Sequence, residues 1–190
     1  MKYKIITDRF EIEKMAEDSY FSGDISTIHV DYADLSTLKR WGTFKYAIVC
    51  DFDTANNDWF EEFKDVIKSI QLPLNNLKAF FLNVLEGGNE KDASLSYADY
   101  IKLQDYFITI RCSEECPADI PDNYTTCLVA LKSRATLPKG ALQIQLMSTY
   151  EKTEQDKQED EKYEQMIEEY RNTVLRPDYS PKFIGILDYD

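Results

Sequence analysis

The chain has 190 residues and a formal net charge of −13, a length that suits one domain with an appendage. Hydrophobic residues make up 43% of it and aromatic residues 13%, which is enough apolar material to build a core. A surface this acidic repels phosphate backbones and anionic lipid. We therefore expect no binding to nucleic acid or to a membrane surface. Much of the excess acid lies in residues 151–169.

The chain shows no signal for insertion into or export across a membrane. No apolar run approaches the roughly 20 residues that span a bilayer. The N-terminal stretch MKYKIITDRFEIEKM has no uninterrupted apolar region of the kind that signal peptides carry. We therefore expect a cytoplasmic protein.

The first part of the chain alternates short extended runs with helical periodicity. In the first helical segment Ile12, Met15 and Ala16 fall on one inner face. A wider apolar face between residues 59 and 70 predicts a second amphipathic helix. In chain order the predicted elements are a strand over 2–7, a helix over 9–20, an extended segment over 25–30, a helix over 35–41, a strand over 44–52 and a helix over 59–70.

The later part of the chain continues the alternation and ends in a charged segment. This order predicts an α/β fold, in which a layered sheet of about four to six strands is covered by helices. In chain order the further predictions are strands over 77–85, 106–112 and 125–131, with a short helix over 97–104, then a half-exposed strand over 141–147, a long charged helix over 151–174 and a final strand over 183–187.

The four cysteines do not form a recognisable framework. Cys112 and Cys116 are spaced as a pair of metal ligands could be, but the only histidine is His29 and there is no second pair at zinc spacing. The runs around Cys50, Cys112 and Cys127 are apolar and strand-like. We expect these three residues to behave as small core side chains.

Several motifs between residues 28 and about 131 resemble the C-terminal domain of FtsZ, the bacterial tubulin homologue. In that family the loop that enters the domain reads roughly N-V/L-D-F-A-D, a following strand reads Y-A-M-M-G, a helix ends in P-L, and a later strand reads V-L-V-N-I-x-x-G. The corresponding stretches here are HVDYAD (29–34), YAIVC (46–50), Pro73-Leu74, and FFLNV (80–84) followed by Gly87-Gly88. The last two strands of the family are resembled by residues 107–113 and 125–130.

The resemblance implies a division of the chain into three parts. Residues 1–27 would form an N-terminal strand and helix, and residues 28–134 the FtsZ-C-terminal-like domain. Residues 135–190 would add a strand, a long charged helix and a final strand, packed on the same domain. Conversely, the GTPase half of FtsZ, with its glycine-rich loop, has no counterpart here, because the six glycines form no cluster that could cradle phosphate. We therefore expect no cofactor and no GTPase activity from this chain alone.

Asp31 and Asp34 are the candidate partner-binding residues, together with their neighbour His29. In FtsZ filaments the acidic loop of one subunit enters the nucleotide pocket of the next. The resemblance thus implies a non-catalytic interaction module that docks on, or caps, a filament of FtsZ or a tubulin-like protein. The alternative is structural: Asp34 would cap a helix starting at Leu35, and Asp31 would be solvated.

Two further functions stay open. A small metal-dependent enzyme would gather acids at the strand ends around Mg²⁺, namely Asp31 and Asp34 with Asp51 and Asp53. Asp51 and Asp53 follow a hydrophobic strand, although no supporting Lys or Ser/Thr motif accompanies them. A scaffold protein would instead use the long C-terminal helix to form a homo-oligomer. Its apolar stripe consists of Tyr163, Met166, Ile167, Tyr170 and Val174.

Overall fold

The computed structural model describes residues 2–21, 25–53, 58–88, 95–112 and 127–174. The chain divides into two compact units, Met1–Glu151 and Lys152–Asp190. The elements of the first unit are β1 (Lys2–Ile6), α1 (Arg9–Phe21), β2 (Ile25–Ile28), α2 (Tyr32–Trp41), β3 (Thr43–Asp53), α3 (Trp59–Ile70), β4 (Leu77–Gly87), α4 (Tyr97–Cys112), β5 (Cys127–Arg134) and β6 (Ala141–Tyr150). The described part of the second unit is one helix, α5 (Glu154–Val174).

The strands form one six-stranded mixed sheet in the order β1-β3-β6-β4-β5-β2. β4 and β5 pair in parallel, and the other neighbours pair antiparallel. A parallel pair needs a crossover connection, and α4 lies in the segment that joins β4 to β5. The architecture is therefore the layered α/β fold expected from the alternation of elements.

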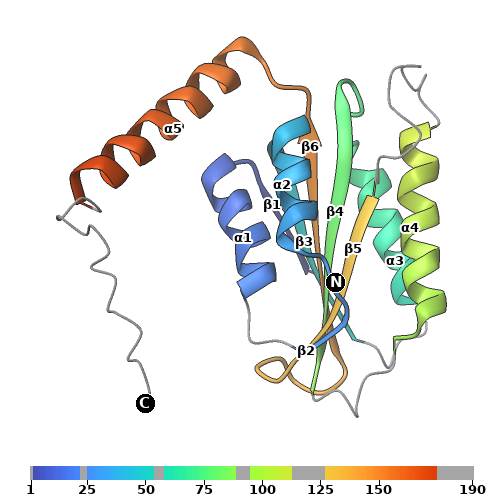
Figure 1. Cartoon of the computed structure of the whole chain (residues 1–190). Helices are drawn as coiled ribbons and strands as arrows, with labels where there is room; N and C mark the ends of the chain where they lie inside the picture. The colour runs from blue at the N-terminus through green and yellow to red at the C-terminus, as the bar shows by residue number, and fades with distance from the viewer. Residues whose placement is uncertain (1, 22–24, 54–57, 89–94, 113–126, 175–190) are drawn as a thin grey trace, which may run out of the picture. The chain divides into compact units, whose positions relative to one another are not determined.

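Helices cover both faces of the sheet. Figure 1 shows α1 and α2 on one face and α3 and α4 on the other. Side chains alternate between the two faces along each strand, so the sheet takes part in two separate apolar clusters. The smaller cluster, under α1 and α2, consists of Ile6, Ile12, Ala16, Val30, Leu35, Leu38, Phe44, Ala47, Ala79, Phe81, Ala130 and Met147.

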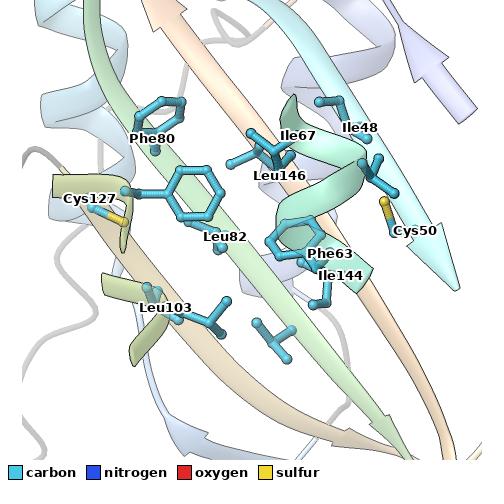
Figure 2. Packing of buried hydrophobic residues seen from close by; sticks show 14 of the residues in the cluster. Ile48, Cys50, Phe63, Ile67, Phe80, Leu82, Leu103, Cys127, Ile144 and Leu146 are labelled. Atoms are coloured by element: carbon cyan, nitrogen blue, oxygen red, sulfur yellow. The ribbon is translucent and has the colours of Figure 1, made fainter. Parts of the chain in front are cut away.

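The larger cluster fills the space between the sheet and α3 and α4 (Figure 2). Phe63 from α3 and Phe107 from α4 are fully buried, with ring centroids 5.9 Å apart, and Phe107 also packs edge-on against Phe80 at 4.8 Å. Cys50 and Cys127 are buried in this cluster, as expected of small core residues. Burial, with a smaller effect from Asp51, raises the pKa of Cys50 to about 12, so its thiol stays protonated.

Most elements agree with the sequence predictions. The strands expected over 2–7, 44–52, 77–85 and 125–131 are confirmed as β1, β3, β4 and β5, and the helices over 9–20 and 59–70 as α1 and α3. The inner face of α1 is also confirmed, because Ile12 and Ala16 are fully buried whereas Phe10 is 70% exposed. The predicted final strand over 183–187 lies outside the described residues.

The strand predicted over 106–112 is wrong. These residues continue the preceding helix, and α4 runs without a break from Tyr97 to Cys112. The run YFITIRC is rich in residues that favour strands, but Leu103 and Phe107 are four apart and both buried. Burial of this helical face against the sheet outweighs the local strand propensity. The stretch 107–113, which contributed to the resemblance as a strand, is therefore helical as far as Cys112, where α4 ends.

The strand predicted over 141–147 is confirmed as β6, but the expectation that it is half-exposed is wrong. β6 lies between β3 and β4, and its residues from Ile144 to Tyr150 are buried without interruption. The alternation of ALQIQLM reflects a division between two covered faces. Leu142, Ile144 and Leu146 join the larger apolar cluster, whereas Gln143 and Gln145 lie on the opposite face together with the buried Met147.

Candidate functional site

The acidic loop forms a capping box at the start of α2. Helix α2 begins at Tyr32, three residues earlier than predicted, and Asp31 is its N-cap. The Asp31 Oδ1 accepts a hydrogen bond from the Asp34 backbone N–H at 2.8 Å, and the Asp34 Oδ2 accepts one from the Asp31 N–H at 3.1 Å. The expectation that Asp34 caps a helix from Leu35 while Asp31 is merely solvated is thus wrong, since the two carboxylates cap reciprocally.

An aromatic cluster lies beside this box. The ring of Tyr20, on α1, is 5.8 Å from the ring of His29 and 6.2 Å from that of Tyr32. His29 and Asp31 are exposed, and Tyr32 is 61% exposed. We call Tyr20, His29, Asp31, Tyr32 and Asp34 the acidic aromatic surface. It combines carboxylates and accessible rings on one small area at the junction of α1 and α2.

Ion pairs hold the two helices of this surface together. Lys39 on α2 is 2.6 Å from a Glu17 carboxylate oxygen and 3.4 Å from a Glu13 oxygen, both on α1. Burial alone would lower the pKa of Lys39, but the two glutamates raise it above its ordinary value. Lys39 therefore stays charged and links α2 to α1.

The second predicted pair of acids lies in β3 itself and not in a turn after it. Asp51 accepts a hydrogen bond at Oδ1 from Gln143 Nε2, 2.9 Å away, and both Asp51 and Asp53 are exposed. Within the described ranges, no group of three or more His, Cys, Asp or Glu side chains is arranged to hold a metal ion. Cys116 lies outside those ranges.

A row of side-chain amides, which the sequence analysis did not single out, crosses the sheet on the α1 face. Asn83 Nδ2 donates to Gln145 Oε1, Gln145 Nε2 donates to Gln143 Oε1, and Gln143 Nε2 donates to Asp51, each over 2.9 Å. We call these four residues the amide row. The signal in the sequence was an asparagine inside the apolar run FFLNVL and two glutamines at alternate positions of ALQIQLM. A polar residue in a buried strand requires a hydrogen-bonding partner.

A comparison with protein-family models finds no match, and a search of curated proteins finds no significant one. In the part of the chain that the structure describes, no helix combines the length and the apolar character needed to cross a membrane.

Proposed function

We propose that the chain is a non-catalytic protein-interaction module that binds its partner through the acidic aromatic surface. The observation that carries this proposal is the exposed ring of Tyr32, which lies in the sequence between the two capping carboxylates of Asp31 and Asp34. Tyrosine is enriched at protein interfaces because it offers a large, rigid apolar area and a polar tip.

The partner that fits this surface presents a basic segment. Each capping carboxylate has a second oxygen that the box does not use, and a Lys or Arg side chain would pair with it. The neighbouring rings offer cation–π contacts to the same side chain. The net charge of −13 would steer a basic partner toward the molecule. The resemblance to FtsZ makes an FtsZ or tubulin-like protein the first partner to test.

The test is polymerisation and GTP hydrolysis of the FtsZ of the same host, followed by light scattering and phosphate release, with this protein added in increasing ratio. The decisive variant is Asp31→Ser with Asp34→Gln, because a Ser-x-x-Gln sequence keeps a capping box but removes both charges. Tyr32→Ala removes the exposed ring separately. We expect the wild type to change polymerisation and both variants to lose the effect while keeping the wild-type melting temperature.

Two results would contradict the proposal. If the wild type leaves the FtsZ polymer and its GTPase rate unchanged, this partner is wrong. A pull-down with a basic peptide array then tests the surface without assuming a filament. If the Ser/Gln variant acts like the wild type in either assay, the carboxylates are caps and nothing more.

A second candidate function is self-association through α5. Tyr163 and Met166 are three residues apart on this helix and are 55% and 57% exposed. Such a pair is a suitable contact for a second copy of the helix. Sedimentation equilibrium of the wild type and of Tyr163→Ser with Met166→Ser tests this: a dimer that the variant loses supports it, and a monomeric wild type contradicts it.

A further inference from the structure

A cavity of about 350 Å³ lies between α1 and the sheet, over one end of the amide row. Its floor includes Asn83 and Gln145, and Ile6 and Met15 form an apolar wall. Ligand cavities in proteins commonly range from about 300 to 1,000 Å³, so this one suits a small molecule. The other lining residues are Glu11, Lys14, Asp18 and Ser19 from α1, and Arg134 from the end of β5.

Asn83 brings an unsatisfied acceptor to this cavity. Its side chain is only 1% exposed, and its Oδ1 has no hydrogen-bonding partner in the described structure. Buried polar atoms are paired in the great majority of cases, because an unpaired one loses its bond to water without replacement. The orphaned oxygen therefore marks the place where a donor group is missing.

The direction of the amide row explains why the free end is an acceptor. Each amide in the row donates an N–H to the neighbour on the Asp51 side, and its oxygen is left to accept from the other side. The chain ends with Asn83 Oδ1. An exposed carboxylate at the far end polarises each amide in turn, which strengthens the terminal oxygen as an acceptor. A strong donor such as an ammonium group is the best complement to it.

The charges around the cavity narrow the ligand class further. Two acids, Glu11 and Asp18, and two bases, Lys14 and Arg134, line it, so both signs of charge face the cavity. A molecule with one positive and one negative group can pair with both signs, whereas a ligand with a single charge can pair with only one. Glu11 is already paired with Lys4 at 2.8 Å. Asp18 is therefore the lining acid that would attract the ammonium group of a ligand.

We propose that this cavity binds a small zwitterion of the free α-amino-acid class, whose ammonium group donates to Asn83 Oδ1 and whose carboxylate faces the Arg134 and Lys14 side. The apolar wall of Ile6 and Met15 takes the side chain of the ligand, which favours small aliphatic amino acids. This site is independent of the acidic aromatic surface, because the two share no residue.

The experiment is isothermal titration calorimetry of the full chain with glycine, L-alanine, L-valine and L-serine. Ethylamine and propionate serve as probes that carry only one of the two charged groups. We expect at least one amino acid to bind, and each single-charge probe to bind at least about tenfold more weakly. Asn83→Leu is expected to abolish the binding. Its melting temperature is expected to stay near that of the unliganded wild type, because the change removes the orphaned Oδ1 together with the N–H that Gln145 Oε1 accepts.

A second variant guards against a folding artefact. Asp18→Asn changes an exposed residue at the edge of the cavity and is expected to weaken binding several-fold without changing the melting temperature. The matched control is Asp105→Asn, an exposed acid on α4 outside the cavity, which is expected to bind like the wild type. Three results would overturn the proposal: no heat from any amino acid at about 10 mM, as for a cavity filled by water alone; unchanged binding in Asn83→Leu; or equal binding of the single-charge probes.

Discussion

At the scale of residues, two of the motifs that carry the family resemblance have local physical reasons. Asp31 and Asp34 form a reciprocal capping box. At Gly87 an added Cβ would collide with the Pro138 carbonyl, and Gly88 has a φ of 112°, a value that favours glycine. A pattern of two acids or two glycines can therefore recur because a helix start or a tight turn requires it, without a shared function.

The capping box predicts a measurable loss of stability. Asp31→Ala should lower the free energy of unfolding by about 1 kcal/mol, because the Asp34 N–H loses its acceptor. The Ser/Gln replacement of both acids should stay within about 0.5 kcal/mol of the wild type, since its box is intact. Urea unfolding followed by circular dichroism measures both. A loss of the same size in the Ser/Gln variant would show that charge, and not capping, stabilises α2.

At the scale of elements, α4 shows how packing overrides propensity. The helix is anchored by Leu103 and Phe107, which are buried against β4 and β5, whereas Thr109 is exposed. In a strand Phe107 and Thr109 would share one face, but in a helix they do not. The burial of Phe107 and the exposure of Thr109 therefore distinguish a helix from a strand here.

Substitutions on the two sides of α4 should differ sharply. Phe107→Ala should cost about 3–5 kcal/mol, because it opens a cavity beside Phe63 and Phe80. Thr109→Ala, the matched control, should cost less than about 1 kcal/mol, because only an exposed hydroxyl bond to the Asp105 carbonyl is lost. Thermal or urea unfolding of both variants measures the loss in the free energy of unfolding. Equal losses in the two variants would contradict the assignment of these residues to a helix.

The start of α4 predicts a pH dependence of stability. Burial alone would raise the pKa of Asp99, but hydrogen bonds from the Ser96 N–H and Oγ, at 2.9 and 2.7 Å, and the nearby Lys102 lower it below its ordinary 3.8. Because the folded-state pKa is the lower one, the stabilisation is complete above the unfolded value and disappears as the pH falls through the folded value.

Asp99→Asn should therefore destabilise the protein near neutral pH by about 1 kcal/mol. The difference from the wild type should shrink below about pH 4, as the wild-type carboxyl group takes up its proton. Urea unfolding at several pH values measures it, with Ser96→Ala as the control that removes the partner instead of the acid. A difference that stays constant down to about pH 2 would contradict the assigned hydrogen bonds.

At the scale of the whole molecule, β6 completes the sheet of the first unit. It pairs with β3 along one edge and with β4 along the other, so it joins strands that are distant in sequence. The Glu151 N–H donates to the Asn76 carbonyl at 2.8 Å, which closes the end of this strand against the turn before β4. The sheet is therefore finished at Glu151.

A chain of residues 1–151 should accordingly fold and unfold cooperatively, with a melting temperature within a few degrees of that of the full chain. A chain of residues 1–140 should not fold, because β3 and β4 would lose their common neighbour and expose two open edges. Circular dichroism and analytical ultracentrifugation test both chains. Loss of cooperative unfolding in the longer one would show that the first unit needs residues beyond Glu151.

The sequence by itself determined the fold class and most of the elements. A period of about four residues in the apolar pattern indicates which face of a helix is buried, and this holds for α1 and α3 without knowledge of their neighbours. The acidic loop was also singled out from the sequence, and a helix cap was expected in it, although at Asp34 and not at Asp31. Local hydrogen bonds within three residues need no distant partner.

Only the tertiary structure decided the rest. Whether YFITIRC becomes a helix depends on the apolar sheet face above it, and the central place of β6 depends on pairings made across about a hundred residues of chain. The amide row has the same origin, since its members come from three different strands. Asn83, Gln143 and Gln145 are unremarkable one at a time. They become a hydrogen-bonded row with an unsatisfied acceptor only when strand register brings them together beneath α1.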